Sequence, residues 1–236
     1  MVDIMTTHKA LVVGAQGVIG RSVAEHLSTR PGWEVIGVSR RTAQDRETLR
    51  HLRIDLLDPD DCNAKLSELH DITDLVFAAY AERPTPAELV KVNVALLQNH
   101  LDAVEPSSPQ LRHVTLYQGG KAYGCHLGPF KTPAREDDPR YLGVNMPCGD
   151  PLPLRLTEQM ADKESIWKRI TERHGLEPIP YSQIASWAFG DAIFGTCYDN
   201  ISSTIKLRRA GFPDCIDTEE MFCTLFDQLR RKRIIP

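Results

Sequence analysis

Hydrophobic and polar positions alternate in two ways along the first half of the chain. Short apolar runs, typical of buried parallel strands, are separated by amphipathic stretches with helical spacing. The apolar runs predict strands at 10–13, 35–38, 53–56, 75–79 and 113–117. The amphipathic stretches predict helices at 18–27, 60–69 and 86–104. Because strand–helix–strand crossovers are right-handed, this order predicts a doubly wound parallel sheet with a ligand crevice at the carboxyl ends of its strands.

The second half of the chain has a different pattern. Between residues 118 and 153 the periodicity disappears, and glycine, proline and charged residues predict a long loop. Apolar-faced helices are predicted at 157–174 and 218–231, the second with Thr218 as its N-cap. We therefore expect an α/β, Rossmann-like domain of five strands over residues 1–150 and a small, mostly helical lobe over 151–236.

A glycine-rich turn follows the first predicted strand and opens the first predicted helix. Its glycines are spaced G-x-x-G-x-x-G. In such a turn the first glycine permits a tight bend, the second lets backbone N–H groups approach a pyrophosphate, and the third allows close packing of helix on strand. We expect a dinucleotide to contact this turn at Gly14, Gln16, Gly17, Val18, Ile19 and Gly20.

The end of the second strand indicates which dinucleotide is bound. An Asp or Glu at this place would accept hydrogen bonds from the adenosine ribose, as NAD(H) requires. This chain has Ser39, Arg40 and Arg41 instead. Two guanidinium groups match a phosphate with forked, charge-assisted hydrogen bonds, so the sequence predicts NADP(H) as the cofactor. Further cofactor contacts are expected at or directly after the ends of the later strands, at Asp55, Leu56, Ala79, Tyr80 and Gln118.

Composition limits the remaining possibilities. A chain of 236 residues with 42% hydrophobic residues can bury one core with a small lobe. The net charge of −4 gives no basic surface of the kind that binds nucleic acid. The lack of a long apolar run or a signal peptide predicts a cytoplasmic protein with no membrane segment. Six cysteines without a C-x-x-C pair suggest neither a metal site nor disulfides. His26 and His100 are expected at the surface or the edge of the core.

Taken together, these motifs give the chain a family resemblance. It resembles the progesterone 5β-reductase and iridoid synthase (PRISE-like) family, which are atypical extended short-chain dehydrogenases/reductases. The resemblance covers most of the chain, and its most specific part is the stretch from Lys121 to Phe130. The segments that carry it are 14–20, 37–41, 71–77, 99–104, 119–130, 160–167 and 230–236.

The resemblance implies an NADPH-dependent oxidoreductase that reduces the activated C=C bond of a small enone or enal, or a related carbonyl compound. Negative charge then develops on the carbonyl oxygen, so the site needs a donor aimed at that oxygen. The family supplies a tyrosine hydroxyl and a lysine that contacts the nicotinamide ribose, and Lys121 matches this lysine. The tyrosine lies in an Asn-Phe-Tyr-Tyr motif, whereas Asn145 of this chain is followed by Met-Pro-Cys-Gly-Asp. Tyr123 and Tyr141 are the candidates to replace it.

An internal stretch of the family is also missing. Roughly ten residues join this region to the segment at Leu156, too few for the crossover unit of ~30 residues that the family's sixth strand requires. Other hypotheses therefore stay open beside the reductase. The chain could be a catalytically silent NADP(H)-binding relative, a non-redox isomerase or cyclase on a reshaped scaffold, or a deletion product whose exposed helix faces lead to self-association. A homodimer is compatible with these faces.

Overall fold

The computed structural model describes residues 8–125, 127–128, 130–138, 155–196, 198 and 200–236. The chain divides into two compact units, Met1–Gln118 and Gly119–Pro236. Residues 119–138 thus group with the C-terminal part of the chain. The expected domain boundary between residues 150 and 151 lies outside the described residues and stays a prediction.

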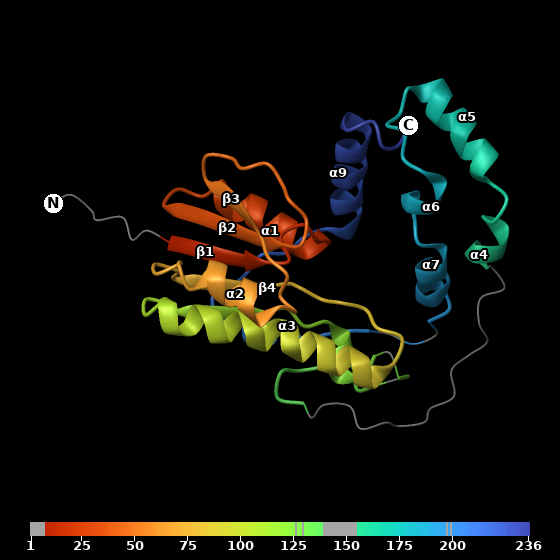
Figure 1. Ribbon diagram of the computed structural model, residues 1–236. Helices are drawn as coiled ribbons and strands as arrows, with labels where there is room; N and C mark the ends of the chain where they lie inside the picture. The colour runs from red at the N-terminus through yellow and green to blue at the C-terminus, as the bar shows by residue number, and fades with distance from the viewer. Residues whose placement is uncertain (1–7, 126, 129, 139–154, 197, 199) are drawn as a thin grey trace. The chain divides into compact units, whose positions relative to one another are not determined.

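A parallel five-stranded sheet forms the centre of the first unit (Figure 1). Its strands are β1 (His8–Val13), β2 (Trp33–Ser39), β3 (Leu49–Arg53), β4 (Asp74–Phe77) and β5 (His113–Leu116). Their order in the sheet is β3-β2-β1-β4-β5, and each neighbouring pair is parallel. The direction of winding therefore reverses between β1 and β4, which creates a crevice at the carboxyl ends of these strands. The predicted fold class is confirmed.

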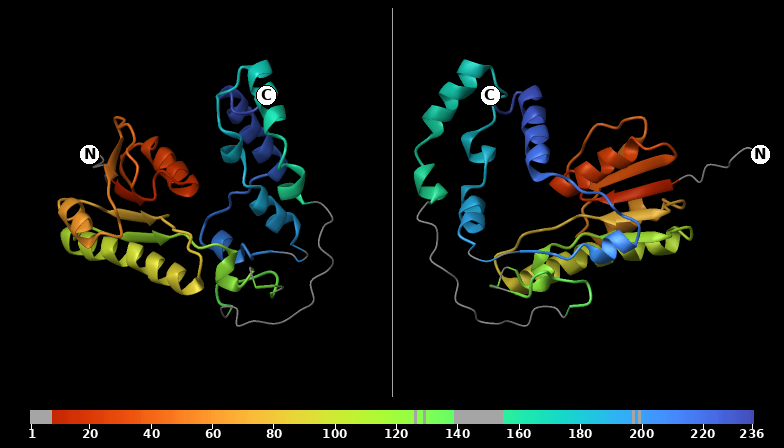
Figure 2. Two further views of the ribbon diagram at one scale, coloured as in Figure 1. Left: turned by 45° about the vertical axis from the view of Figure 1, so that its right-hand side comes forward. Right: turned by 180° about the vertical axis from the view of Figure 1, so that it is seen from behind.

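Helices cover both faces of this sheet, as the views of Figures 1 and 2 show. Helix α1 (Val18–Ser28) lies on one face, and α2 (Pro59–Leu66) packs on α3 (Pro86–Ser107) over the other. Because successive side chains of a strand point to opposite faces, β1 contributes Leu11 and Val13 to one core, and Ala10 and Val12 to the other. Both cores are buried, so β1 is the central strand that fixes the crevice.

Two expectations for the first unit were wrong. The third strand runs over Leu49–Arg53 and not over 53–56, because it pairs with β2 along its whole length in the register Val35↔Leu49 to Ser39↔Arg53. Ile54 and Leu56 are buried beyond the end of this strand. His100 is fully buried under the sheet, not at its surface, and its ring stacks on Phe77 with centroids 5.7 Å apart.

The second unit is helical, as expected for the C-terminal lobe. A short 3-10 helix, η1 (Gly120–Tyr123), is followed by six α-helices in the described residues. They are α4 (Leu156–Gln159), α5 (Glu164–His174), α6 (Tyr181–Ile184), α7 (Trp187–Phe194), α8 (Ile205–Arg209) and α9 (Thr218–Arg231). Within the unit α4 contacts α7, and α5 contacts α6.

The predicted helix at 157–174 is divided in two. The break lies between α4 and α5, where the hydroxyl of Tyr181 donates to the Met160 carbonyl at 2.5 Å. The carboxylate of Asp191 accepts hydrogen bonds from the backbone N–H groups of Leu156 and Thr157 and so caps α4. These contacts come from residues more than twenty positions away, which helical periodicity does not reveal.

The C-terminal helix has the predicted bounds, but its N-cap is Asp217 and not Thr218. The Asp217 carboxylate accepts from the Glu220 N–H at 2.9 Å. A carboxylate suits this place because it also complements the positive end of the helix dipole. The loop expected over 118–153 contains η1, and its remaining part after residue 138 lies outside the described residues.

Candidate functional site

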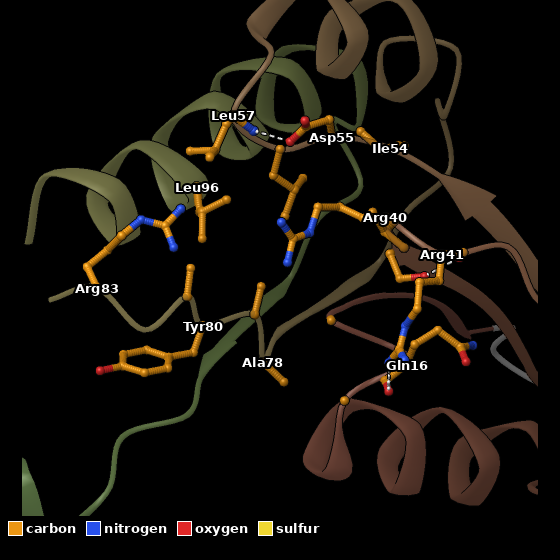
Figure 3. A pocket seen from close by; sticks show the side chains of 17 residues that line it. Gln16, Arg40, Arg41, Ile54, Asp55, Leu57, Ala78, Tyr80, Arg83 and Leu96 are labelled. Carbon is orange, nitrogen blue, oxygen red and sulfur yellow. Dashed lines mark hydrogen bonds between the residues drawn. The ribbon is translucent and has the colours of Figure 1, made fainter. Parts of the chain in front are cut away.

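A cleft of about 600 Å³ opens in the first unit at the carboxyl ends of β1, β2 and β4 (Figure 3). The sheet topology places these three strand ends together, because the winding reverses beside β1. Most of the residues expected to contact a cofactor line this cleft. They are Gly14, Gln16, Gly17, Ser39, Arg40, Arg41, Asp55, Leu56, Ala79 and Tyr80.

The glycine turn forms the floor of the cleft. Gly14 has a φ of +84°, and a Cβ atom there would lie 2.8 Å from the Ala78 carbonyl carbon on the neighbouring strand end. A Cβ atom on Gly20 would lie 2.3 Å from the Gly14 carbonyl oxygen. Both positions therefore need glycine, one for its backbone conformation and close approach, the other for helix packing. The turn is held to β2 by the Gly14 N–H, which donates to the Val38 carbonyl at 2.9 Å.

Helix α1 begins at this turn without a side-chain cap. Gly17 is its N-cap residue, and the first turn of the helix has no acidic residue. The N–H groups at the start of a helix and its dipole favour an anion, so the end of α1 can receive a phosphate group. Val18 is 80% exposed, which leaves space above the helix start.

The two arginines after β2 lie on different sides of the cleft. Arg40 extends into the cleft, whereas Arg41 lies beside Gln16 (Figure 3). The Arg41 Nη2 atom donates to the Gln16 carbonyl oxygen at 2.9 Å, and the Ser39 hydroxyl donates to the Arg41 carbonyl oxygen at 2.6 Å. These bonds fix the segment after β2 against the glycine turn. The cleft lining thus presents three arginines, Arg83 included, and one carboxylate, Asp55.

Residues after β3 form a third side of the cleft. Asp55 is exposed, and one of its carboxylate oxygens accepts from the Leu57 N–H at 3.1 Å. Leu56 is buried, and its carbonyl oxygen accepts from the Asn99 side chain at 2.9 Å. The chain therefore turns here in a fixed position, with an apolar wall that includes Leu57.

The fourth side of the cleft comes from the residues after β4. Partial burial, together with the nearby Glu82 carboxylate, raises the pKa of the Tyr80 hydroxyl, so this group is a neutral donor at pH 7.

The sequence did not predict several residues that line the cleft: Val38, Ile54, Leu57, Ala78, Ala81, Arg83 and Leu96. Proximity to the strand ends could have indicated Arg83, whereas Leu96 comes from the middle of α3 and carries no local signal.

Some predicted site residues are not part of this lining. Val18, Ile19 and Gly20 begin α1 behind the turn, and Gln118 is the last residue of the first unit. Lys121 and Tyr123 belong to η1 of the second unit, where Lys121 is exposed and Tyr123 is half-buried.

The structure does not test the catalytic candidates Lys121, Tyr123 and Tyr141. Tyr141 lies outside the described residues, so the roles of all three catalytic candidates stay predictions.

Within the part of the chain that is described, no helix is long and apolar enough to cross a membrane, and no three His, Cys, Asp or Glu side chains gather to hold a metal ion.

The sheet order, the glycine turn at the start of α1 and the cleft at the switch point define a Rossmann-type fold of the kind found in nucleotide-binding proteins. Residues 50–147 match the family model described as a PRISE-like Rossmann-fold domain. This match confirms the resemblance found in the motifs of the chain.

Curated relatives support this assignment. An (S)-8-oxocitronellyl enol synthase from Nepeta cataria is 38% identical over 151 residues, which cover 58% of this chain and 38% of that protein. A 3-oxo-Delta(4,5)-steroid 5-beta-reductase from Arabidopsis thaliana is 37% identical over 139 residues, 56% of this chain and 34% of that protein. The match thus spans less than two fifths of the length of these relatives.

The solved structures agree with this fold. A uronate dehydrogenase from Agrobacterium tumefaciens aligns over 94% of this chain and 90% of that one, with a TM-score of 0.50 and 16% identity. At this identity the likeness concerns the fold alone.

Proposed function

We propose that the cleft of the first unit binds NADP(H). The observation that carries this proposal is the pair Arg40 and Arg41 directly after β2, beside an uncapped helix start and with no carboxylate at the end of β2. A phosphate on the adenosine ribose would lie between the two guanidinium groups and the Ser39 hydroxyl. The lining residues leave space for such a ligand, since glycine stands at both places where a Cβ atom would close the turn.

The other contacts follow from the sides of the cleft. The pyrophosphate would meet the N–H groups at the start of α1, including those of Val18, Ile19 and Gly20. Asp55 and Leu56 would contact the adenine end. Ala79 and Tyr80 after β4, and Gln118 after β5, would contact the part of the coenzyme that leads to its nicotinamide.

We propose that the chain acts as a reductase of small enones, enals or related carbonyl compounds. Support comes from relatives named as an enol synthase and a steroid 5-beta-reductase. The bound coenzyme would supply a hydride. Lys121 would contact the nicotinamide ribose, and Tyr123 or Tyr141 would donate to the carbonyl oxygen where negative charge develops.

Two measurements test these proposals separately. In the first, NADPH and NADH are titrated into the protein while nicotinamide fluorescence is followed, and tighter binding of NADPH is expected. In the second, a panel of enals, enones and simple aldehydes is added to the NADPH complex, and oxidation of the coenzyme is expected. Equal affinity for NADH would contradict the assignment of the coenzyme, and no turnover across the panel would contradict the reductase.

A second candidate function is a silent NADP(H)-binding protein. It is favoured by the sequence after Asn145, which lacks the Asn-Phe-Tyr-Tyr motif, and by the short span of the match to the relatives. Under this alternative NADPH binds, depends on Arg40 and Arg41, and is not consumed with any substrate of the panel.

The assembly is a further proposal. Helix α9 exposes Phe222 and Phe226, which are 49% and 45% exposed and whose tilted rings lie with centroids 6.0 Å apart. Such apolar exposure supports a homodimer. The proposed partner is a small-molecule substrate and not a nucleic acid, and the proposed compartment is the cytoplasm. Light scattering of the purified protein after gel filtration measures the oligomeric state.

A further inference from the structure

Arg83 is a third arginine of the cleft, and no motif of the sequence assigns a role to it. It lies in the connection between β4 and α3, on the opposite side of the cleft from Arg40 (Figure 3). Its side chain is half-buried, whereas those of Arg40 and Arg41 are exposed. The guanidinium points toward Leu96, so its place differs from that of the two arginines after β2.

The backbone that carries Arg83 is fixed on both sides. Before it, the Asn93 side chain accepts from the Ala81 N–H and donates to the Ala81 carbonyl oxygen, both at 2.8 Å. After it, Thr85 caps α3 by accepting from the Glu88 N–H at 3.3 Å. A side chain on such a short, anchored connection loses little conformational freedom when it meets a ligand.

The guanidinium itself is only partly engaged. Its Nη1 atom donates to the Glu82 carbonyl oxygen at 2.8 Å. Among the described residues, the arginines that pair with carboxylates are others, all outside the cleft. Most of the donors of the planar group therefore remain for a ligand.

Apolar residues line the cleft together with Arg83. Leu96 is buried, Leu57 is 38% exposed, and Ala81 is half-buried. All three line the same cleft as Arg83. A doubly charged phosphate would be poorly solvated among these side chains, whereas a flat aromatic ring fits between apolar walls and a guanidinium plane.

We propose that Arg83 binds the adenine base, by packing its planar guanidinium on a face of the ring beside Leu57 and Leu96. The inference rests on the proposed coenzyme site and adds a residue that contacts the base. In this arrangement Arg40 binds the phosphate on the adenosine ribose, and Arg83 binds the base. Substitution of Arg40 should therefore affect only ligands that carry this phosphate, whereas substitution of Arg83 should affect every ligand that carries adenine.

Calorimetric titration of the full chain with NADPH, NADH and 2′,5′-ADP tests this division. Arg83→Gln is expected to weaken all three ligands by a similar factor, about fivefold to thirtyfold. Arg40→Ala is expected to weaken NADPH and 2′,5′-ADP but to leave NADH nearly unchanged. Arg83→Lys keeps the charge without the flat group, and we expect it to bind as weakly as Arg83→Gln.

Other outcomes would overturn the inference in identifiable ways. A loss in Arg83→Gln that is confined to the phosphorylated ligands would make Arg83 a phosphate contact, and full affinity in Arg83→Lys would show that charge alone acts. Unchanged affinity in Arg83→Gln would remove its role altogether. If the wild-type protein binds none of the three ligands, the proposed coenzyme site fails, which differs from each of these results. Thermal unfolding of every variant checks that the fold is kept.

Discussion

The guanidinium of Arg41 donates to the carbonyl oxygen of Gln16 at 2.9 Å, across 25 residues of sequence. The bond joins the segment after β2 to the glycine turn at the start of α1. Arg41 therefore has a structural contact in addition to any contact with a ligand, whereas Arg40 extends freely into the cleft (Figure 3). The two neighbouring arginines should respond differently to substitution.

Replacing Arg40 with alanine is expected to weaken NADPH binding by about tenfold to a hundredfold, because a charge-assisted hydrogen bond contributes about 1.5–3 kcal/mol. NADH has no phosphate on the adenosine ribose, so its affinity should change little. Nicotinamide fluorescence titration measures both constants. Arg50→Ala is the matched control, since Arg50 is an exposed arginine of β3 that does not line the cleft. An equal loss for both coenzymes in Arg40→Ala would contradict a phosphate contact.

Replacing Arg41 with alanine is expected to weaken both coenzymes. The variant loses the bond to Gln16, so the glycine turn is less well held before any ligand arrives. We expect NADH affinity to fall about fivefold to tenfold, with a larger loss for NADPH. The same titration as for Arg40→Ala gives the comparison. Wild-type affinity for NADH in this variant would mean that the Arg41–Gln16 bond does not organise the site.

The close packing at Gly20 should make this position intolerant of any side chain. A Cβ atom there would lie 2.3 Å from the Gly14 carbonyl oxygen, and the contact is with backbone that cannot rotate away. We expect Gly20→Ala to lower the free energy of unfolding by about 3 kcal/mol. Urea unfolding followed by circular dichroism measures this change.

Gly119→Ala provides the control for that experiment. A Cβ atom on Gly119 meets nothing within 4 Å, and its backbone is extended, with a φ of −97°. Its stability should stay within about 0.5 kcal/mol of the wild type. If both glycine variants unfold at the same urea concentration, helix α1 does not need its close approach to the turn.

The parts of the fold that sequence predicted well are those with local signals. The end of β1 and the start of α1 follow from an apolar run and the glycine turn after it, and β2 ends directly before Arg40 and Arg41, which are proposed to bind the coenzyme. The third strand was misplaced because Leu49–Arg53 is an edge strand with exposed polar residues, so its membership depends on pairing with β2. Periodicity does not report such pairing.

The site shows the same division between local and distant signals. Gly14 and Arg40 belong to motifs with a known spacing, whereas Arg83 and Leu96 reach the cleft only because the sheet order places β4 beside β1, so that residues after β4 and residues of α3 line the same cleft as the ends of β2 and β3. The breaks in the second unit also depend on distant partners, such as Tyr181 at the carbonyl of Met160. Tertiary contacts of this kind have no signature in a single sequence.

His100 should make the stability of the protein depend on pH. Its ring is fully buried, neither ring nitrogen has a hydrogen-bond partner among the described residues, and burial lowers its pKa to about 4. The unfolded chain, with a histidine pKa near ~6.5, binds a proton between these values that the folded protein does not bind. Stability is therefore retained above the unfolded pKa and falls as the pH decreases from there toward 4. We expect a loss of about 2 kcal/mol between pH 7 and pH 5.

His100→Leu should remove this dependence. Leucine fills a similar volume against Phe77 and brings no unpaired ring nitrogens into the core, so stability at pH 7 should be equal or higher. His26→Ala is the comparison, because His26 is exposed on α1 and its loss should leave the slope of stability against pH as in the wild type. Urea unfolding at pH 5, 6 and 7 gives the three slopes. An undiminished slope in His100→Leu would mean that another group binds the proton on unfolding, and that burial of His100 costs the protein nothing at low pH.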